Sequence, residues 1–387
     1  MIIKDVEAKS IKDSRGNNTI KIFIKTNVGR FSASAPNGKS KGKNEAKPYK
    51  KSLEEDIKKV GQFSEYFSEE YLEKFEDLRR IEDIIQKDVG ANTLVAFEFA
   101  ALKAMAKEQK KEIWQIVNPE AKKIPRLVGN CIGGGLHSEE TKEKRPDFQE
   151  FLLIPESKSA IKSFEINKIA KKDVELDLKK IDEHFASKKN DENAWRTSLD
   201  DKRVLEILFK TGIPLGLDVA ASSFHKRKKY YYENPKLDRT KEEQIGYLSN
   251  LIKNFDIFYI EDAFGEEDFE SFALLLKKFP NKLIVGDDLT VTNYKRLEKA
   301  IEMKAVNALI VKPNQNGSLL EVKRVVELAK ENNIKIIFSH RSGETDETIL
   351  ADLAFGFQAE FFKSGTEGDV RVKKIKRLIE IEKSIKI

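Results

Sequence analysis

The stretch Leu215-Gly216-Leu217-Asp218 is a short apolar run that ends in an acid, and it is the first of six comparable runs in the second half of the chain. The other five also end in charged or hydroxyl-bearing residues: Phe258-Tyr259-Ile260-Glu261-Asp262, Ile284-Val285-Gly286-Asp287-Asp288, Leu309-Ile310-Val311-Lys312, Ile336-Ile337-Phe338-Ser339-His340-Arg341-Ser342 and Phe361-Phe362-Lys363-Ser364. Counted from Glu261 onward, successive runs end about 25 residues from one another. Each interval therefore has room for one strand and one helix. Buried parallel strands read as continuous apolar runs, and a barrel of such strands gathers its chemistry at the strand C-termini. The pattern therefore predicts an α/β barrel with a functional site at one rim.

The composition is that of an ordinary soluble protein. The chain has 387 residues, of which 40% are hydrophobic and 35% charged, and this length suits a barrel plus a second domain. No run approaches the roughly 18 apolar residues of a membrane helix, and Met1 to Asp5 lacks the apolar core of a signal peptide. A single cysteine, Cys131, excludes an internal disulfide and a cysteine-based metal cluster. We therefore expect a cytoplasmic protein that does not bind membranes.

The first third of the chain predicts a separate α+β domain. In residues 19–26 the isoleucines alternate with lysines and Phe23, and residues 31–35 predict a short return strand after the turn at 27–29. From about 44 to 107 the apolar spacing becomes helical, and Pro119 to Pro125 marks the crossing into the barrel. We predict an N-terminal domain over 1–120 and a TIM-like (β/α) barrel over 121–387.

Three acids end successive strands and suit a metal ion. Asp218, Glu261 and Asp287 offer hard oxygen ligands, and the chain has one cysteine and four histidines, which favours Mg²⁺ over zinc. The alternative is that each acid caps or salt-bridges a neighbouring helix. Three acids in register at strand ends favour the metal site.

The remaining strand ends suit an anionic substrate. Lys312 follows an apolar strand, and neighbouring cations with partial burial would disfavour its ammonium form, so that it could act as a base. His340-Arg341-Ser342 offers an arginine fork and a hydroxyl for a phosphate, and Lys363 could balance a carboxylate. Removing a proton beside a carboxylate needs strong charge stabilisation, which two Mg²⁺ ions can supply.

At this point the sequence resembles the enolase family over most of its length. The resemblance rests on these segments: Asp13-Ser14-Arg15-Gly16-Asn17, Gly38-Lys39-Ser40-Lys41-Gly42, Asn130 to His137, Asp147-Phe148-Gln149-Glu150-Phe151, Gly216 to Ser222, Gly286 to Asn293 and Ser339 to Thr345. It implies an enolase-type eightfold barrel with an α+β N-terminal capping domain and a homodimer. It also implies a carbon–oxygen hydro-lyase that interconverts 2-phosphoglycerate and phosphoenolpyruvate in glycolysis and gluconeogenesis.

The resemblance also implies roles for individual residues. Asp218, Glu261 and Asp287 would bind the first Mg²⁺, and Ser40 would help bind a second Mg²⁺ that arrives with the substrate. Lys312 would remove the proton at carbon two. The catalytic set would further contain Glu192, Glu150 and His137, with the two glutamates assisting departure of the hydroxyl. Substrate contacts would come from Ser40, His340, Arg341, Ser342 and Lys363.

The sequence departs from the family pattern near the loops that complete the site. Asn193-Ala194 stands where the family has Gly-Gly after its glutamate, and Lys39 and Lys41 add positive charge to the first loop. These changes keep a second reading open, a diverged enolase-like protein that acts on another carboxylate or serves as a non-catalytic scaffold or RNA binder. His225 to Tyr232 places basic groups beside tyrosines, which could suggest RNA. We prefer a loop whose tyrosines pack onto the barrel. The net charge of +6 comes from intermixed charges, so nucleic-acid binding is not expected.

Overall fold

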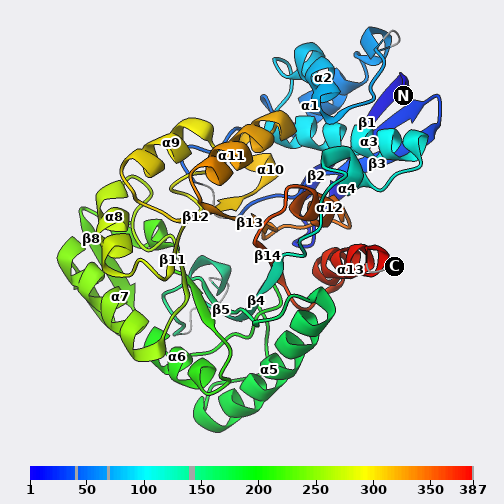
Figure 1. Cartoon of the computed structure of the whole chain (residues 1–387). Coiled ribbons are helices and arrows are strands. Elements are labelled where there is room, and N and C mark those ends of the chain that lie inside the picture. The colour runs from blue at the N-terminus through cyan, green and yellow to red at the C-terminus, as the bar shows by residue number, and fades with distance from the viewer. Residues whose placement is uncertain (40–41, 68–69, 139–143, 386–387) are drawn as a thin grey trace.

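The computed structural model describes the 387-residue chain apart from residues 40–41, 68–69, 139–143 and 386–387. A closed eight-stranded barrel occupies the second part of the chain, and a three-stranded sheet with its helices forms the first part. Figure 1 shows the barrel helices as a ring, with the N-terminal elements to one side of it. The predicted fold class is therefore confirmed.

The N-terminal part is an antiparallel meander covered by helices. Its strands are β1 (Ile3–Lys12), β2 (Asn18–Thr26) and β3 (Gly29–Ser34), in the order β1-β2-β3. Its helices are α1 (Leu53–Val60), η1 (Ser64–Phe67), η2 (Phe75–Asp77), α2 (Leu78–Ile85), α3 (Ala91–Gln109) and α4 (Ile113–Val117). Helix α3 packs on β2 and β3 and is buried along most of its length. It therefore forms the centre of this domain.

The two strands predicted for this part are β2 and β3, and β1 was not predicted. This strand is rich in lysine and acids, and only Ile3, Val6 and Ala8 are buried. A bulge between Ile3 and Asp5 shifts its register against β2, so its inward residues do not keep a simple alternation. Pairing with β2, rather than a hydrophobic pattern, defines this strand.

The barrel strands follow the order β10-β11-β12-β13-β14-β4-β5-β6. They are β4 (Arg126–Gly133), β5 (Glu150–Leu153), β6 (Leu215–Asp218), β10 (Tyr259–Glu261), β11 (Leu283–Gly286), β12 (Ala308–Val311), β13 (Lys335–Ser339) and β14 (Phe361–Gly365). All six apolar runs quoted above form barrel strands. The strands formed by these six runs pair parallel with one another, whereas β5, which was not among the runs, pairs antiparallel with both β4 and β6.

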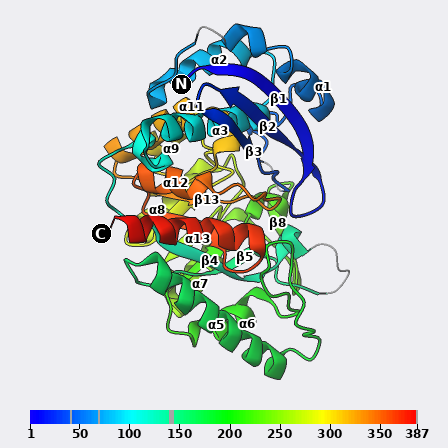
Figure 2. The ribbon, with the colours of Figure 1, turned by 90° about the vertical axis from the view of Figure 1, so that its right-hand side faces the viewer.

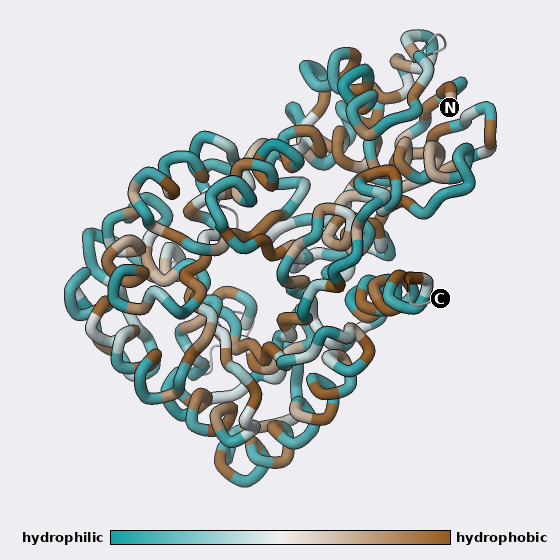
Figure 3. Tube along the Cα trace, in the orientation of Figure 1, coloured by the Kyte–Doolittle hydropathy of each residue, from teal (hydrophilic) through white to brown (hydrophobic). Residues whose placement is uncertain are grey.

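Helices surround the strands on the outside. They are α5 (Ala160–Ile181), α6 (Asp201–Phe209), α7 (Lys241–Phe255), α8 (Phe269–Lys278), α9 (Tyr294–Glu302), α10 (Pro313–Asn316), α11 (Leu319–Glu331), α12 (Ile349–Gly356) and α13 (Asp369–Ser384), with short turns η3 (Gly135–Ser138) and η4 (Ala221–Ser223). The stripe predicted for α11, Val322, Val325, Val326 and Ala329, is buried. Figure 3 shows hydrophobic and hydrophilic residues alternating along the outer helices, as expected for helices with one buried face.

The two parts share one core. Buried side chains of β1–β3 and α1–α4 belong to the same hydrophobic cluster as those of α11, α12 and α13. A second cluster fills the space between the barrel and α5–α9, and a third, with Val285, Ile310 and Ile337, fills the barrel interior. Figure 2 shows the N-terminal elements lying against the side of the barrel that carries α11 and α12.

The basic, tyrosine-rich segment forms a small sheet. Strands β7 (His225–Lys226), β8 (Lys229–Glu233) and β9 (Lys236–Arg239) pair antiparallel. Tyr230 and Tyr232 are buried in the barrel–helix core, whereas Tyr231 is exposed. Two of the three tyrosines therefore pack onto the barrel as predicted, and the third does not. Within the parts of the chain that the structure describes, no helix has both the length and the apolar character that crossing a membrane requires.

Candidate active site

The C-terminal rim of the barrel brings together the acids predicted from the sequence. Asp218 and Glu261 are the last residues of β6 and β10, and Asp287 follows β11 directly. All three side chains are buried. The parallel register pairs Asp218 directly with Glu261, and it pairs Glu261 with Val285, two residues before Asp287.

The antiparallel strand β5 delivers a further acid to the same rim. Because β5 runs the other way, its first residue, Glu150, pairs in register with Asp218, the last residue of β6. The preceding residue, Gln149, donates from Nε2 to Oδ2 of Asp218 at 3.2 Å. Reversal of one strand thus places Glu150 where a parallel strand would place its C-terminal residue.

Lys363 of β14 lies at the centre of these acids. Its ammonium contacts Oδ2 of Asp218 at 3.0 Å, Oε2 of Glu261 at 2.8 Å and Oε2 of Glu150 at 2.8 Å. Burial lowers the pKa of Lys363, but the surrounding carboxylates outweigh burial and raise it well above its ordinary value. Burial and the charge of Asp218 raise the pKa of Glu261 well above its ordinary value. The ammonium of Lys363 is therefore surrounded by three carboxyl groups.

Lys312 follows β12 and pairs with Asp287. Its Nζ donates to Oδ2 of Asp287, and Gln315 donates from Nε2 to the other oxygen, Oδ1, at 2.9 Å. Burial lowers the pKa of Lys312, but Asp287 outweighs burial and raises it. The expectation of a disfavoured ammonium form is therefore wrong for this arrangement, because the lysine has a carboxylate partner.

Two histidines and two glutamates form a second group of buried charged side chains, which shares Glu150 with the group around Lys363. His137 Nδ1 lies 3.5 Å from Oε1 of Glu150 and 3.7 Å from Oε1 of Glu192, and His340 Nε2 lies 3.5 Å from Oε2 of Glu192. Burial and the charge of Glu192 raise the pKa of Glu150 to about 7. Burial would raise the pKa of Glu192, but both histidines counter it and hold the pKa well below its ordinary value. Burial lowers the pKa of His340 to about 4. Two neighbouring carboxyls with separated pKa values suit acid–base work.

The turn that carries Glu192 is built around Asn190 and Asn193. The Asn190 side chain accepts hydrogen bonds from the backbone N–H groups of Glu192 at 3.0 Å and Ala194 at 2.9 Å. Asn193 has φ of +62°, a left-handed conformation that asparagine tolerates better than most residues. The Glu192 side chain is buried and accepts from Nδ2 of Asn130 at 3.1 Å. The Asn-Ala variation therefore still directs Glu192 into the pocket.

The segment after β13 supplies the arginine and the serine. Arg341 and Ser342 are buried, and Ser342 Oγ accepts from the backbone N–H of Lys39 at 2.7 Å. Arg371 of α13 donates to the carbonyl oxygens of Arg341 at 3.1 Å and Ser342 at 2.8 Å, so it braces this segment from behind. Ser40, predicted to contact both substrate and metal, lies outside the described residues.

Acidic residues that sequence reasoning missed lie next to the predicted ones. Among the described residues, two sets present ligand atoms close enough for one metal ion: Asp262, Asp287 and Asp288, and His137, Glu150 and Glu192. Asp262 accepts from the backbone N–H groups of Asp287 at 2.9 Å and Asp288 at 2.8 Å, which holds the turn after β11. Burial and Asp287 raise the pKa of Asp288 to about 8. The doubled acids Glu261-Asp262 and Asp287-Asp288 were visible in the sequence, but only the first of each was chosen.

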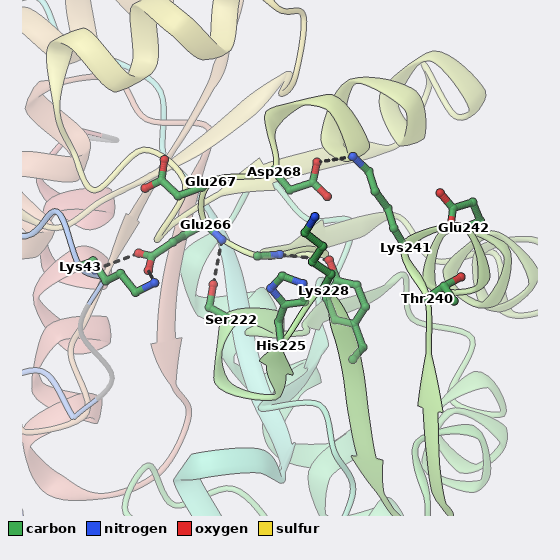
Figure 4. A pocket seen from close by; sticks show the side chains of 12 residues that line it. Lys43, Ser222, His225, Lys228, Thr240, Lys241, Glu242, Glu266, Glu267 and Asp268 are labelled. Carbon is green, nitrogen blue, oxygen red and sulfur yellow. Dashed lines mark hydrogen bonds and ion pairs between the residues drawn. The ribbon is translucent and has the colours of Figure 1, made fainter.

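Nine of the predicted residues line one small cavity of about 20 Å³, and Glu261 and Asp287 are not among its lining residues. Its lining includes His137, Glu150, Glu192, Asp218, Lys312, His340, Arg341, Ser342 and Lys363. Such a volume holds about one water molecule, so a substrate can enter only when the paired side chains move apart. A larger cavity of about 650 Å³ lies nearby, and its described lining residues include none of the predicted site residues. Figure 4 shows that cavity, with Lys43 paired to Glu266 and Lys241 to Asp268.

Comparison with known proteins assigns nearly the whole chain to one family. Residues 3–117 match the family model "Enolase, N-terminal domain", and residues 121–386 match "Enolase, C-terminal TIM barrel domain". The chain belongs to the enolase family. It is 36% identical to the enolase of Methanosphaera stadtmanae, covering 99% of this chain and 97% of that protein. It is also 36% identical to the enolase of Archaeoglobus fulgidus over the same shares, and 33% identical to that of Pyrobaculum aerophilum over 98% and 96%.

Membership in the enolase family defines the enzyme class. The chain is a lyase with enolase function, and its substrate is a phosphorylated carboxylate. The family also implies a divalent metal ion, for which the pocket offers the acidic groups described above. The reading as a diverged scaffold or an enzyme for another carboxylate is not favoured, because the full-length relatives are enolases.

Proposed function

We propose that the chain interconverts 2-phosphoglycerate and phosphoenolpyruvate, with Mg²⁺ as the metal and the site residues in the roles given below. One observation carries the proposal. Lys312 and the pair Glu150 and Glu192 line the same buried cavity as Arg341 and Lys363. A base, an acid pair, a phosphate ligand and a carboxylate ligand around one cavity are the groups that this elimination requires.

A divalent cation fits the acids of this pocket. Three carboxylates direct oxygens at the single ammonium of Lys363, and carboxylate oxygens without thiolates are the ligands that Mg²⁺ prefers. We propose Asp218, Glu261 and Asp287 as ligands of a first Mg²⁺ and Ser40 as a contributor to a second that binds with the substrate. When bound, the two ions would neutralise the negative charge that builds up beside the substrate carboxylate.

The side chains of the pocket would divide the proton transfers between them. Lys312 takes the proton from carbon two, and it becomes a competent base when Asp287 no longer holds its ammonium. Glu192, with Glu150 and His137 beside it, assists the hydroxyl as it leaves from carbon three. The raised pKa of Glu150, about 7, comes from burial and the charge of Glu192, and it lets this pair hold a proton near neutral pH.

The remaining residues would hold the substrate. Arg341 and Ser342, with His340 and Ser40, contact or close over the phosphate, because an arginine fork and hydroxyl donors match phosphate oxygens. Lys363 leaves its carboxylate partners to face the substrate carboxylate. We further propose a cytoplasmic homodimer that acts in glycolysis and gluconeogenesis, with domains at 1–120 and 121–387.

The direct test is dehydration of 2-phosphoglycerate by the purified protein. We expect phosphoenolpyruvate, followed by its ultraviolet absorbance, to form with Mg²⁺ and not with excess chelator. Restoring Mg²⁺ after chelation should restore the rate, which separates metal dependence from denaturation. No product from a folded protein at saturating Mg²⁺ would refute the proposed reaction.

A further inference from the structure

Glu45 belongs to the segment that follows the first loop, and its carboxylate meets the arginine proposed to bind phosphate. Both of its oxygens contact Nη2 of Arg341, at 3.1 and 3.0 Å. The side chains of Glu45 and Arg341 are only 7% and 4% exposed. A buried pair that engages both carboxylate oxygens constrains the two groups far more than a surface ion pair does.

The same carboxylate reaches two further groups. Oε1 of Glu45 accepts from the backbone N–H of Gly42 at 3.3 Å and from Nε2 of Gln315 at 3.4 Å. Gln315 also donates to Oδ1 of Asp287 at 2.9 Å. Glu45 therefore contacts three groups: the loop end at Gly42, the guanidinium of Arg341, and Gln315, which in turn contacts Asp287.

The backbone around Glu45 is fixed to the barrel. The N–H of Lys43 donates to Glu266 at 2.9 Å, and the N–H of Ala46 donates to the carbonyl of Gln315 at 2.8 Å. The residues on both sides of Glu45 are therefore hydrogen-bonded to the barrel, which fixes the position of the Glu45 backbone.

The guanidinium of Arg341 is held on two more sides. Nη1 donates to Oδ1 of Asn314 at 3.0 Å. The backbone of Gly38 lies so close that a Cβ there would be 1.9 Å from Nη2. Arginine has five N–H donors, so Nε and part of Nη1 remain for an anion while Glu45 and Asn314 hold the plane of the group.

We infer that Glu45 is a positioning residue for substrate phosphate binding. It orients Arg341 and, through Gln315, couples this arginine and the loop end at Gly42 to Asp287. The inference rests on the proposed reaction. Removing the Glu45 charge would free the guanidinium to rotate and would weaken phosphate binding, although Glu45 itself need not touch the substrate.

The test is Glu45→Gln, which keeps the shape and removes the charge. We expect KM for 2-phosphoglycerate to rise about tenfold, which corresponds to about 1.4 kcal/mol, because hydrogen bonds between charged groups are stronger than those between neutral groups. The change in kcat should be smaller. Inhibition by inorganic phosphate should weaken in parallel, which a loss of stability alone would not cause.

Asp352→Asn is the control. Asp352 is 1% exposed and pairs with Arg377 at 2.7 Å, and it lines neither of the two small cavities that Arg341 lines. The KM of this variant should stay within about twofold of the wild-type value, because a pair that shares no partner with the site does not couple to it. Glu45→Asp keeps the charge but shortens the reach, and it should shift KM in the same direction by less, so it serves if Glu45→Gln does not fold.

Two results would overturn the inference. An unchanged KM in both Glu45 variants would remove the positioning role. A lower KM would mean that Glu45 competes with phosphate for Arg341. An inactive wild-type protein in the same assay would instead refute the proposed reaction, so the two failures are distinguishable.

Discussion

At the scale of single residues, the pocket balances buried charges against one another. Lys363 satisfies three acids at once, and Lys312 satisfies Asp287. Burying an unpaired charge is strongly unfavourable, whereas a fully paired cluster is tolerated. Each lysine therefore stabilises carboxylates that would otherwise be buried without a counter-charge.

Replacing Lys312 with Ala should remove the base while leaving the fold intact. We expect kcat to fall by at least about a hundredfold, which is the usual loss when a positioned proton acceptor is removed. Initial rates of phosphoenolpyruvate formation would measure the loss, with circular dichroism as the check on folding. Lys103→Ala removes a paired lysine outside the small cavity and should keep nearly wild-type turnover. Near-normal activity of the Lys312 variant would exclude this lysine as the base.

At the scale of elements, the reversed strand β5 and the turn at 190–194 complete the site. β5 brings Glu150 to the rim of the parallel strand ends. The turn brings Glu192 from a segment with no barrel strand of its own, between α5 and α6. Lys171, buried in α5, donates to the carbonyl of Asn193 and pairs with Glu367 at 3.1 Å. Lys171 therefore ties the turn to α5.

The conformation of Asn193 gives a test of this turn. A β-branched residue at φ of +62° is strained by roughly 1–2 kcal/mol, so Asn193→Val should distort the turn and lower kcat. Asn193→Gly, which adopts this φ readily, should retain activity. Steady-state rates and urea unfolding of both variants would show the difference. Equal activity of the two would mean that the turn does not control Glu192.

At the scale of the whole molecule, the N-terminal domain closes one side of the catalytic barrel. Contacts between the parts include the pair of Lys103 in α3 with Glu347, just before α12, and that of Ser318 Oγ with Glu82. Gly317 lies against α3 with φ of +83°, and a Cβ there would be 2.5 Å from Cα of Ala91. This glycine permits close approach of the two domains.

Gly317→Ala should therefore weaken the association of the domains. We expect a loss of about 3 kcal/mol in the free energy of unfolding, from left-handed strain plus overpacking. Gly212→Ala is the control, because its φ is +65° and a Cβ there would meet nothing within 4 Å. The difference between the two variants in urea unfolding isolates the clash. Equal losses would show that the contact adapts at little cost.

The sequence alone determined six of the eight barrel strands and most of the rim. Parallel strands buried on both faces must be apolar throughout, so their ends, including Asp218, Glu261, Asp287 and Lys312, were readable. Strand β1 could not be read from the sequence, because its pairing with β2 defines it and a hydrophobic pattern does not. Likewise Ser40 stays a prediction, since it lies outside the described residues.

Only the tertiary structure decided how the charged groups meet. The reversal of β5 depends on pairing with β4 and β6, which its four residues do not encode locally. Asp287, the partner of Lys312, follows the neighbouring strand β11, whereas Glu45, the partner of Arg341, comes from the other end of the chain. The pKa of Lys312 is raised because Asp287 outweighs burial, and that balance depends on distances that exist only after folding. Residue types specify the available chemistry, whereas packing selects which charges pair.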